Sequence, residues 1–259
     1  TTQAAAKHGI PHAVDVGVSD KIVNRGLTNT FRFGPGFGAI TKAGVEGFLA
    51  VNKAAGNPTK TVAIVNEETT GFGAGIAGIM TKGLAPAGIE VVEVLSHPTP
   101  NKDFRNIALK LKEIDPDVLI PSHYYNEGVL FLRTLQRQKV QPKAIYSVLG
   151  GASSQYRFVS EFPDAAQYVM DCNHWFDPKN AGALALQKKT NAAGLHYNYE
   201  VFLAYTAMMF TLDAIERAGS ADRTAITEAM TASTWGGHIM PYGATKMENG
   251  QNTGARPLV

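Results

Sequence analysis

The chain has 259 residues, of which 44% are hydrophobic and 18% are charged, so it can form one large or two modest globular domains. Its 24 basic and 22 acidic residues nearly cancel, and no basic stripe with interleaved aromatic residues occurs, which argues against nucleic-acid binding. The single cysteine, Cys172, excludes an internal disulfide and a Cys-rich metal site.

The first thirty residues predict one helix, a short apolar segment near Ala13 to Val16 and a helix start at Ser19-Asp20. From residue 60 the pattern alternates between strand and helix, which predicts a parallel sheet covered on both faces. The expected strands are 62–65, 89–95, 118–120 and 144–148, and the expected helices are 73–84, one that Asp103 caps, and 127–138. Residues 180–235 predict three helices and almost no strand. We therefore expect one complete α/β lobe over about 61–172 and a second lobe assembled from both ends of the chain.

Residues Gly73 to Gly78 form a G-x-G-x-x-G motif between a predicted strand and a predicted helix, as in dinucleotide-binding enzymes. That fingerprint needs the first glycine directly after the strand, so that the helix N-terminus meets a pyrophosphate. Here seven residues, 66–72, lie between strand and motif, and Glu67 and Glu68 would repel a phosphate. We interpret the glycines as positions where the helix packs closely on the sheet. An NAD-dependent oxidoreductase that uses this motif is the alternative.

The sequence contains no recognisable catalytic or metal-binding constellation. The seven histidines include no H-E-x-x-H pattern, and neither G-x-S-x-G nor a Walker A lysine occurs. We therefore predict a protein that is not an enzyme and that needs no cofactor and no metal.

Three loops are expected where the strands of the complete lobe end, at 66–72, 121–126 and 149–154. Ligands of open parallel sheets bind at this edge. Phe72, Tyr124 and Tyr125 could form an aromatic wall with polar tips there, and Gly150 and Gly151 would let a ligand approach bare backbone.

Short segments in a characteristic order resemble the type I periplasmic solute-binding proteins of ABC transporters, in the branch of the leucine/isoleucine/valine-binding proteins. The matching segments extend over nearly the whole chain and are Gly9-Ile10-Pro11, residues 28–32, residues 60–65 followed by Phe72-Gly73, Asp103-Phe104, residues 115–118, Ala204-Tyr205 and residues 214–219.

The resemblance implies an α/β fold of two Rossmann-like lobes with parallel sheets, joined by three crossing segments near 30–34, 170–175 and 239–244. Lobe one would comprise 1–31 and 174–240, and lobe two 32–173 and 241–259. Phe72 and Tyr124 align with aromatic ligand contacts. The first-lobe ligand loop aligns with Val16, Gly17, Val18 and Ser19, and Thr1 lies just after another expected contact.

Two departures from the family pattern bear on these expectations. Family members have a longer N-terminal part that includes the first strands of lobe one, so we expect this chain to be a fragment with an incomplete first lobe. Amino-acid binders of the branch place an acidic residue in the loop after the fourth strand of lobe two, to pair with the ligand ammonium. Here that loop reads Leu149-Gly150-Gly151. An unpaired buried ammonium is unfavourable, so we expect an aromatic or other organic acid, with a branched-chain or other amino acid next.

The predicted function is therefore that of a periplasmic solute-binding component of an ABC importer. The protein would be exported, with a signal peptide outside this chain, and would act as a monomer. It would capture a small carboxylate between its lobes and deliver it to a membrane permease. A cytoplasmic small-ligand sensor of the same fold is a further alternative.

Overall fold

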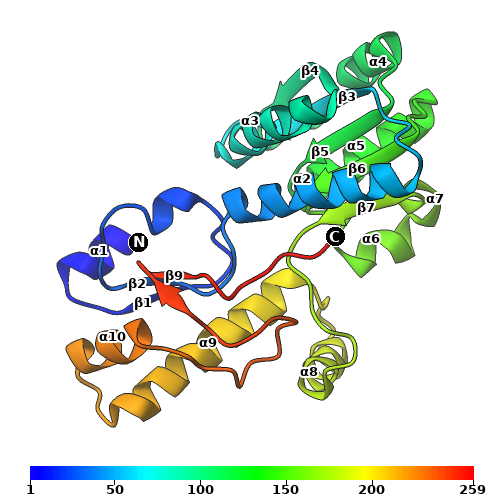
Figure 1. The fold of residues 1–259 in the computed structure, drawn as a ribbon. Helices are drawn as coiled ribbons and strands as arrows, with labels where there is room; N and C mark the ends of the chain where they lie inside the picture. Colours follow the sequence, from blue (N-terminus) through cyan, green and yellow to red (C-terminus); the bar gives the residue numbers. More distant parts are fainter. The chain divides into compact units, whose positions relative to one another are not determined.

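The computed structural model describes residues 1–259 and divides into two compact units (Figure 1). Unit 1 comprises Thr1–Gly36 and His174–Pro257, and unit 2 comprises Phe37–Asn173 and Leu258–Val259. Parallel strands and covering helices make both units α/β, so the predicted fold class is confirmed.

Residues 241–257, which the family resemblance placed in lobe two, lie in unit 1 in the structure. They form the two short strands β8 (Met247–Glu248) and β9 (Gln251–Asn252), and β9 pairs in parallel with β2 (Thr30–Arg32). Only Leu258 and Val259 return to unit 2, where Leu258 bridges Asn173. Two-residue strands show no alternation of polar and apolar residues, so the sequence pattern could not assign them.

Unit 2 contains a five-stranded, all-parallel sheet in the order β4-β3-β5-β6-β7. The strands are β3 (Thr61–Glu67), β4 (Glu90–His97), β5 (Val118–Ser122), β6 (Ala144–Val148) and β7 (Val169–Cys172). Residues 62–67 of β3 are buried, as expected for a strand covered on both faces. The expected strand–helix alternation is confirmed, with β3 and β5 two residues longer at their carboxyl ends than predicted.

Helices cover both faces of this sheet (Figure 1). One face packs against α2 (Phe37–Ala54) and α3 (Phe72–Leu84, continued by the short η2, Ala85–Ala87), and the other against α4 (Arg105–Ile114), α5 (Tyr125–Gln138), α6 (Tyr156–Glu161) and α7 (Pro163–Ala166). On the first face, Tyr146 contacts Phe48 edge to face and donates a hydrogen bond to the Gly44 carbonyl. On the second face, Ala63 and Val65 pack against Phe131 in one apolar cluster.

Unit 1 contains the sheet β1-β2-β9-β8, in which β1 (His12–Val14) runs parallel to β2. Its helices are α1 (Thr2–Lys7), the short η1 (Asp20–Ile22), α8 (Ala181–Ala192), α9 (Tyr199–Ala218) and α10 (Arg223–Thr231). The three helices predicted over 180–235 are therefore confirmed. Each has a polar N-cap side chain that accepts a main-chain N–H, namely Asn180, Asn198 and Asp222.

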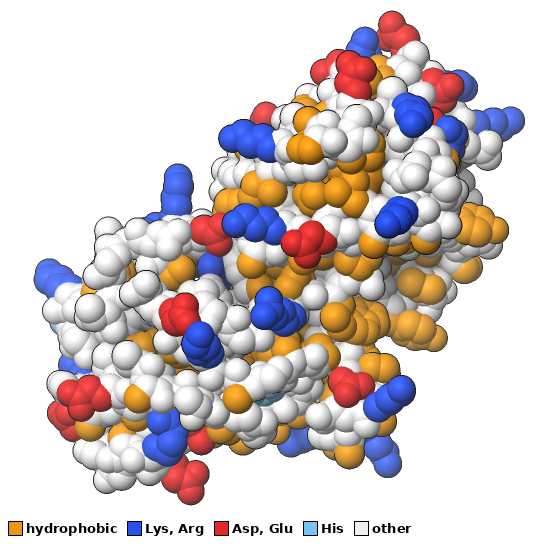
Figure 2. Space-filling model, in the orientation of Figure 1, with side chains coloured by type: hydrophobic (Ala, Val, Ile, Leu, Met, Phe, Trp, Pro, Cys, Tyr) orange, Lys and Arg blue, Asp and Glu red, His pale blue; other side chains and the backbone are white.

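The apolar core of unit 1 lies between the sheet and α9. Phe31 and Phe33 from the β2 segment pack with Phe202 and Phe210 of α9. None of the helices in the structure combines the length and apolar character that a membrane crossing requires. Acidic and basic side chains are interspersed over the face shown in Figure 2, in keeping with the small net charge.

Candidate functional site

The carboxyl ends of β3 and β5 bring two aromatic side chains together in unit 2. Phe72 is the first residue of α3, and Tyr124 is the N-cap residue of α5. Their ring centroids lie 5.4 Å apart with an interplanar angle of 80°, an edge-to-face contact. Phe72 is 8% exposed and Tyr124 is 41% exposed. Tyr124 therefore offers its ring to solvent while Phe72 supports it from behind.

A hydrogen-bonded relay fixes the hydroxyl of Tyr124. The carboxylate of Glu67, buried at the end of β3, accepts the Thr70 N–H at 3.0 Å and the Thr70 hydroxyl at 2.6 Å. The Tyr124 hydroxyl donates to Thr70 Oγ1 in a long bond of 3.4 Å. A threonine hydroxyl carries one hydrogen, which here goes to Glu67, so Thr70 can only accept from Tyr124. The Tyr124 oxygen consequently presents lone pairs to its surroundings.

Glu67 also occupies the position that a phosphate would need at the start of α3. Its Oε1 lies 3.5 Å from the Gly73 nitrogen, which donates to it. A Cβ on Gly73 would lie 2.2 Å from the Glu67 carbonyl oxygen, and one on Gly75 would lie 2.5 Å from the Phe37 ring. These two glycines therefore serve close packing, whereas Gly78 has open space around it. A buried carboxylate at this helix start opposes an anionic pyrophosphate.

The structure does not bring Tyr125 to the Phe72–Tyr124 pair. Its ring packs against the apolar cluster beneath α4 and α5, and the Arg157 guanidinium lies 5.3 Å from the ring centroid. Burial raises the pKa of its hydroxyl. The aromatic wall expected from three residues consists of two in the structure.

Gly150 and Gly151 are buried and face the protein's own chain. A Cβ on Gly151 would lie 2.6 Å from the Tyr125 nitrogen, and its N–H donates to the His123 carbonyl at 2.8 Å. A Cβ on Gly150 would lie 2.0 Å from the Ser147 hydroxyl oxygen. The absence of side chains here lets the loop after β6 pack on the loop that carries Tyr124.

Asp171 on β7 is an acidic neighbour of this loop that sequence reasoning missed. Its Oδ1 accepts the Gly150 N–H at 3.1 Å. Burial raises the pKa of its carboxyl group to about 7, although hydrogen bonds from Gly150, Asn173 and Ser147 oppose that shift. The only signal in the sequence is a single acid within the otherwise apolar segment Val169–Cys172, and the β6–β7 register that places Asp171 opposite Ser147 is not visible there.

Two buried histidines lie beneath the same edge. His97 Nε2 and His123 Nδ1 are 2.8 Å apart, and His97 Nδ1 lies 2.8 Å from the Pro98 carbonyl oxygen. The carbonyl can only accept, so His97 donates to it through Nδ1 and accepts from His123 through Nε2. Burial, with a smaller contribution from His97, holds the pKa of His123 well below its usual value. The hydrogen bond from His123 to His97 anchors His123, the residue that precedes Tyr124.

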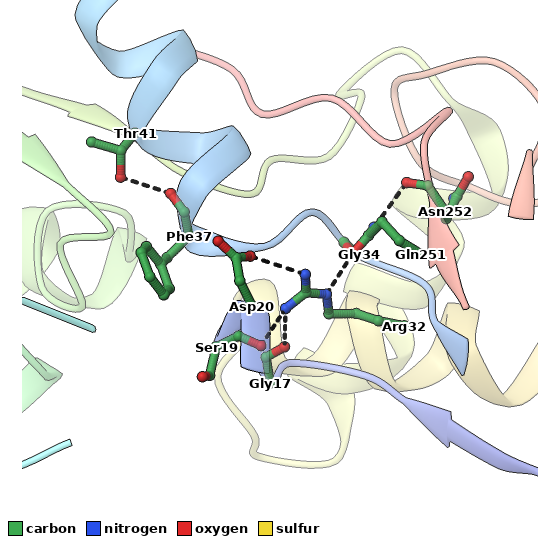
Figure 3. Close-up of polar contacts among 9 residues, drawn as sticks. All are labelled: Gly17, Ser19, Asp20, Arg32, Gly34, Phe37, Thr41, Gln251 and Asn252. Carbon is green, nitrogen blue, oxygen red and sulfur yellow. Dashed lines mark hydrogen bonds and ion pairs between the residues drawn. The ribbon is translucent and has the colours of Figure 1, made fainter. Parts of the chain in front are cut away.

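In unit 1, the predicted ligand residues Val16, Gly17, Val18 and Ser19 form a loop between β1 and η1. The side chain of Arg32, at the end of β2, reaches this loop and hydrogen-bonds to the carbonyl oxygens of Gly17 and Ser19 (Figure 3). Thr1 precedes α1, where its carbonyl accepts the Ala5 N–H, and no hydrogen bond joins it to the Val16–Ser19 loop. No group of three or more His, Cys, Asp or Glu side chains is placed to hold a metal ion.

Comparison with known proteins identifies the family. The model of the family described as "Periplasmic binding protein" matches residues 1–259. The chain belongs to the periplasmic binding protein family. Among curated relatives, Leu/Ile/Val-binding protein homolog 7 of Brucella abortus (strain 2308) is 24% identical over 263 residues, which cover 97% of this chain. The chain spans 65% of the length of that relative.

Solved structures share the fold of this family member. The leucine binding protein of Thermotoga maritima MSB8 superposes with a TM-score of 0.78 at 19% identity, covering 96% of this chain and 69% of that one. A solute binding protein of an ABC transporter from R. palustris, in complex with benzoate, gives a TM-score of 0.81 at 17% identity and covers 99% and 68% of the two chains. The resemblance to the leucine/isoleucine/valine-binding branch is thus confirmed, and the similar proteins include solute-binding proteins of ABC transporters.

Proposed function

We propose that this chain is the solute-binding component of an ABC importer and captures a small carboxylate, with aromatic or other organic acids favoured. In this proposal the protein is periplasmic, acts without catalysis as a monomer, and delivers its ligand to a membrane permease. Family membership supports the transport role. The observation that carries the ligand class is the exposed Tyr124 ring braced edge-on by Phe72 at the carboxyl edge of the parallel sheet.

Three features favour an aromatic acid at this edge. A flat apolar ligand can stack on the Tyr124 ring without loss of its contact with Phe72. The Tyr124 oxygen, which donates its hydrogen to Thr70, offers an acceptor to a ligand hydroxyl group. The loop from Leu149 to Ser154 contains no acid that would pair with an ammonium. The structurally similar protein from R. palustris binds benzoate.

Asp171 supports a second candidate, an amino acid. Its carboxyl group accepts the Gly150 N–H and has a pKa raised to about 7 by burial. A ligand ammonium beside this group would stabilise its charged form. Under this hypothesis Asp171 replaces the acid that other amino-acid binders carry in the adjacent loop.

A thermal-shift and calorimetry screen of the full chain tests the proposal. We expect benzoate or 3,4-dihydroxybenzoate to raise the melting temperature more than leucine or valine, because a ligand at about 100 times its Kd adds about 2.7 kcal/mol to the free energy of unfolding. Stabilisation by leucine or valine alone would refute the preference for aromatic acids. Stabilisation by millimolar NAD would refute the binding-protein proposal in favour of the oxidoreductase.

Replacement of Tyr124 tests the placement of the ligand. Tyr124→Ala should weaken binding of the best ligand by about 1–3 kcal/mol, the range for loss of an aromatic or hydrogen-bond contact. Tyr124→Phe should weaken 3,4-dihydroxybenzoate but not benzoate, because it removes only the acceptor oxygen. Tyr156→Ala, at a tyrosine that is 77% exposed on α6, is the matched control. Equal affinity in Tyr124→Ala and the control would remove Tyr124 from the site.

A further inference from the structure

We infer that Arg32 is a positioning residue for ligand binding: its guanidinium holds the Val16–Ser19 loop so that the main-chain N–H groups of this loop are available to a ligand carboxylate. The inference rests on the proposed function, because it assumes that this loop contacts the ligand. It assigns no ligand contact to Arg32 itself.

The Arg32 side chain is 3% exposed and bonds to three separate parts of unit 1 (Figure 3). Its Nη1 donates to the carbonyl oxygens of Ser19 at 2.7 Å and Gly17 at 3.4 Å. Its Nη2 donates to Asp20 Oδ1 at 3.1 Å, and its Nε donates to Gln251 Oε1 at 2.6 Å. One planar group thus joins the loop after β1, the start of η1 and strand β9.

The surroundings leave the guanidinium little freedom to move. A Cβ on Gly36 would lie 2.2 Å from Arg32 Nη2, so the guanidinium packs directly on the backbone of a residue without a side chain. Gln251, which accepts from Arg32, also donates through Nε2 to the Gly34 carbonyl at 3.0 Å. The Arg32 N–H donates to the Gly250 carbonyl at 2.7 Å. Gly250 and Gln251 therefore fix the orientation of the planar guanidinium group that contacts the loop.

The hydrogen bonds of the loop show what this arrangement leaves free. Arg32 holds the carbonyl groups of Gly17 and Ser19, and Asp15 Oδ1 accepts the Val16 N–H at 2.7 Å. The N–H groups of Gly17, Val18 and Ser19 donate to no acceptor within the chain. Three successive residues are only partly exposed and carry unused donors. Unpaired main-chain donors in a fixed loop suit an anion.

Arg32 acts here through geometry more than through net charge. Asp20 lies beside the guanidinium and balances its charge. Arginine offers five donors in a rigid planar fork, whereas lysine offers one compact ammonium on a flexible stem. Lysine at position 32 would keep the charge but could not hold Gly17, Ser19, Asp20 and Gln251 together.

The test compares Arg32→Lys with wild type in the affinity for an acid and for its amide, with benzoate and benzamide as one pair and leucine and leucinamide as the other. We expect Arg32→Lys to weaken the acid about tenfold, equal to about 1.4 kcal/mol, and the amide much less. A merely destabilised unit 1 would weaken acid and amide alike. Arg217→Lys is the matched control, because Arg217 also joins a carboxylate, Asp213, to a main-chain carbonyl, that of Ala229.

The role of Arg32 and the proposed transport function can be tested separately. An unchanged acid-to-amide ratio in folded Arg32→Lys, or an equal change in Arg217→Lys, would overturn the inference while the transport role stands. If Arg32→Lys does not fold, Gln251→Ala, which removes the acceptor of the Arg32 Nε and leaves the other three Arg32 side-chain hydrogen bonds, should lower the ratio in the same direction by a smaller factor.

If the wild type binds neither acid, the proposed function fails, and amide hydrogen exchange still decides the role of Arg32. In the unliganded protein, Arg32→Lys should speed exchange at residues 17–19 and leave the α9 core unchanged. Equal exchange at residues 17–19 in wild type and variant would overturn the inference.

Discussion

The two units place their candidate ligand-binding residues by different means. In unit 2 a chain of side-chain hydrogen bonds does so: Glu67 holds Thr70, and Thr70 receives the hydroxyl of Tyr124. In unit 1 a single buried side chain does so: Arg32 reaches back to the Gly17 and Ser19 carbonyl groups and forward to Gln251. Unit 2 thus offers an aromatic ring and an acceptor, and unit 1 offers main-chain donors.

This difference predicts how substitutions in each unit affect stability and ligand binding. The Tyr124 loop also rests on the loop after β6, through the contact of Gly151 with the backbone of residues 123–125. Changes there should affect the stability of unit 2 before they affect binding. In unit 1 the Val16–Ser19 loop depends on one buried side chain, so a single substitution should alter binding with less effect on the core.

The largest expected effect comes from Gly151→Ala. The new Cβ would lie within 3 Å of three backbone atoms of residues 123–125, which cannot move as a flexible side chain would. We expect a loss of about 2–3 kcal/mol in the free energy of unfolding, in the range for overpacked cores. Urea denaturation would measure it. Gly78→Ala is the control: nothing lies within 4 Å of its Cβ, and alanine in an exposed helix position should stabilise by about 0.5–1 kcal/mol. Equal stability of the two variants would contradict the packing argument.

A smaller effect is expected from Thr70→Val, which preserves shape and removes the hydroxyl of the relay. Glu67 would lose its 2.6 Å hydrogen bond and Tyr124 its acceptor. We expect a loss of about 1–2 kcal/mol in the free energy of unfolding, since hydrogen bonds to charged groups are worth about 1.5–3 kcal/mol and Thr70 is exposed. Affinity for 3,4-dihydroxybenzoate should change as well.

Thr81→Val, at an exposed threonine of α3 whose hydroxyl donates to the Ala77 carbonyl, is the matched control for Thr70→Val. Its unfolding free energy and its ligand affinity should both stay close to those of wild type. If Thr70→Val is as stable as this control and binds ligand equally well, the relay does not fix Tyr124, and the contrast between the two units disappears.

The elements of unit 2 could be predicted from sequence because each apolar strand and amphipathic helix has its own periodicity. The location of Phe72 and Tyr124 at one edge of the sheet could also be predicted, because both follow the carboxyl ends of buried strands within a few residues. The positions of Tyr125 and Asp171 could not be predicted, because they depend on rotation at a helix start and on strand register. The role of Arg32 was equally hidden, since its partner Gln251 is 219 positions away on a two-residue strand.

Asp171 is tested by the pH dependence of stability and separates the two candidate ligands. The pKa of Asp171 is about 7 in the folded protein, whereas its ordinary value is 3.8. Between about pH 4 and 7 the folded state therefore binds more protons than the unfolded state. Its contribution to stability is therefore fully present below about pH 4 and is lost as the pH rises to about 7. Comparison with Asp171→Asn by urea denaturation from pH 4.5 to 7.5 cancels the other titrating groups. The wild-type minus variant difference should fall with a slope of at most about 1.4 kcal/mol per pH unit, and the slope should decrease as the pH passes through about 7.

Ligands should change this slope in opposite ways. A bound leucine ammonium beside Asp171 would stabilise the carboxylate and flatten the dependence, whereas benzoate has no cation and would leave it unchanged or steeper. Flattening by leucine would assign unit 2 the ammonium of an amino acid. No flattening, together with tight benzoate binding, would leave Tyr124 and its acceptor oxygen as the specificity element of unit 2. A difference between wild type and Asp171→Asn that does not vary with pH would contradict the raised pKa and would remove the physical basis for the amino-acid candidate.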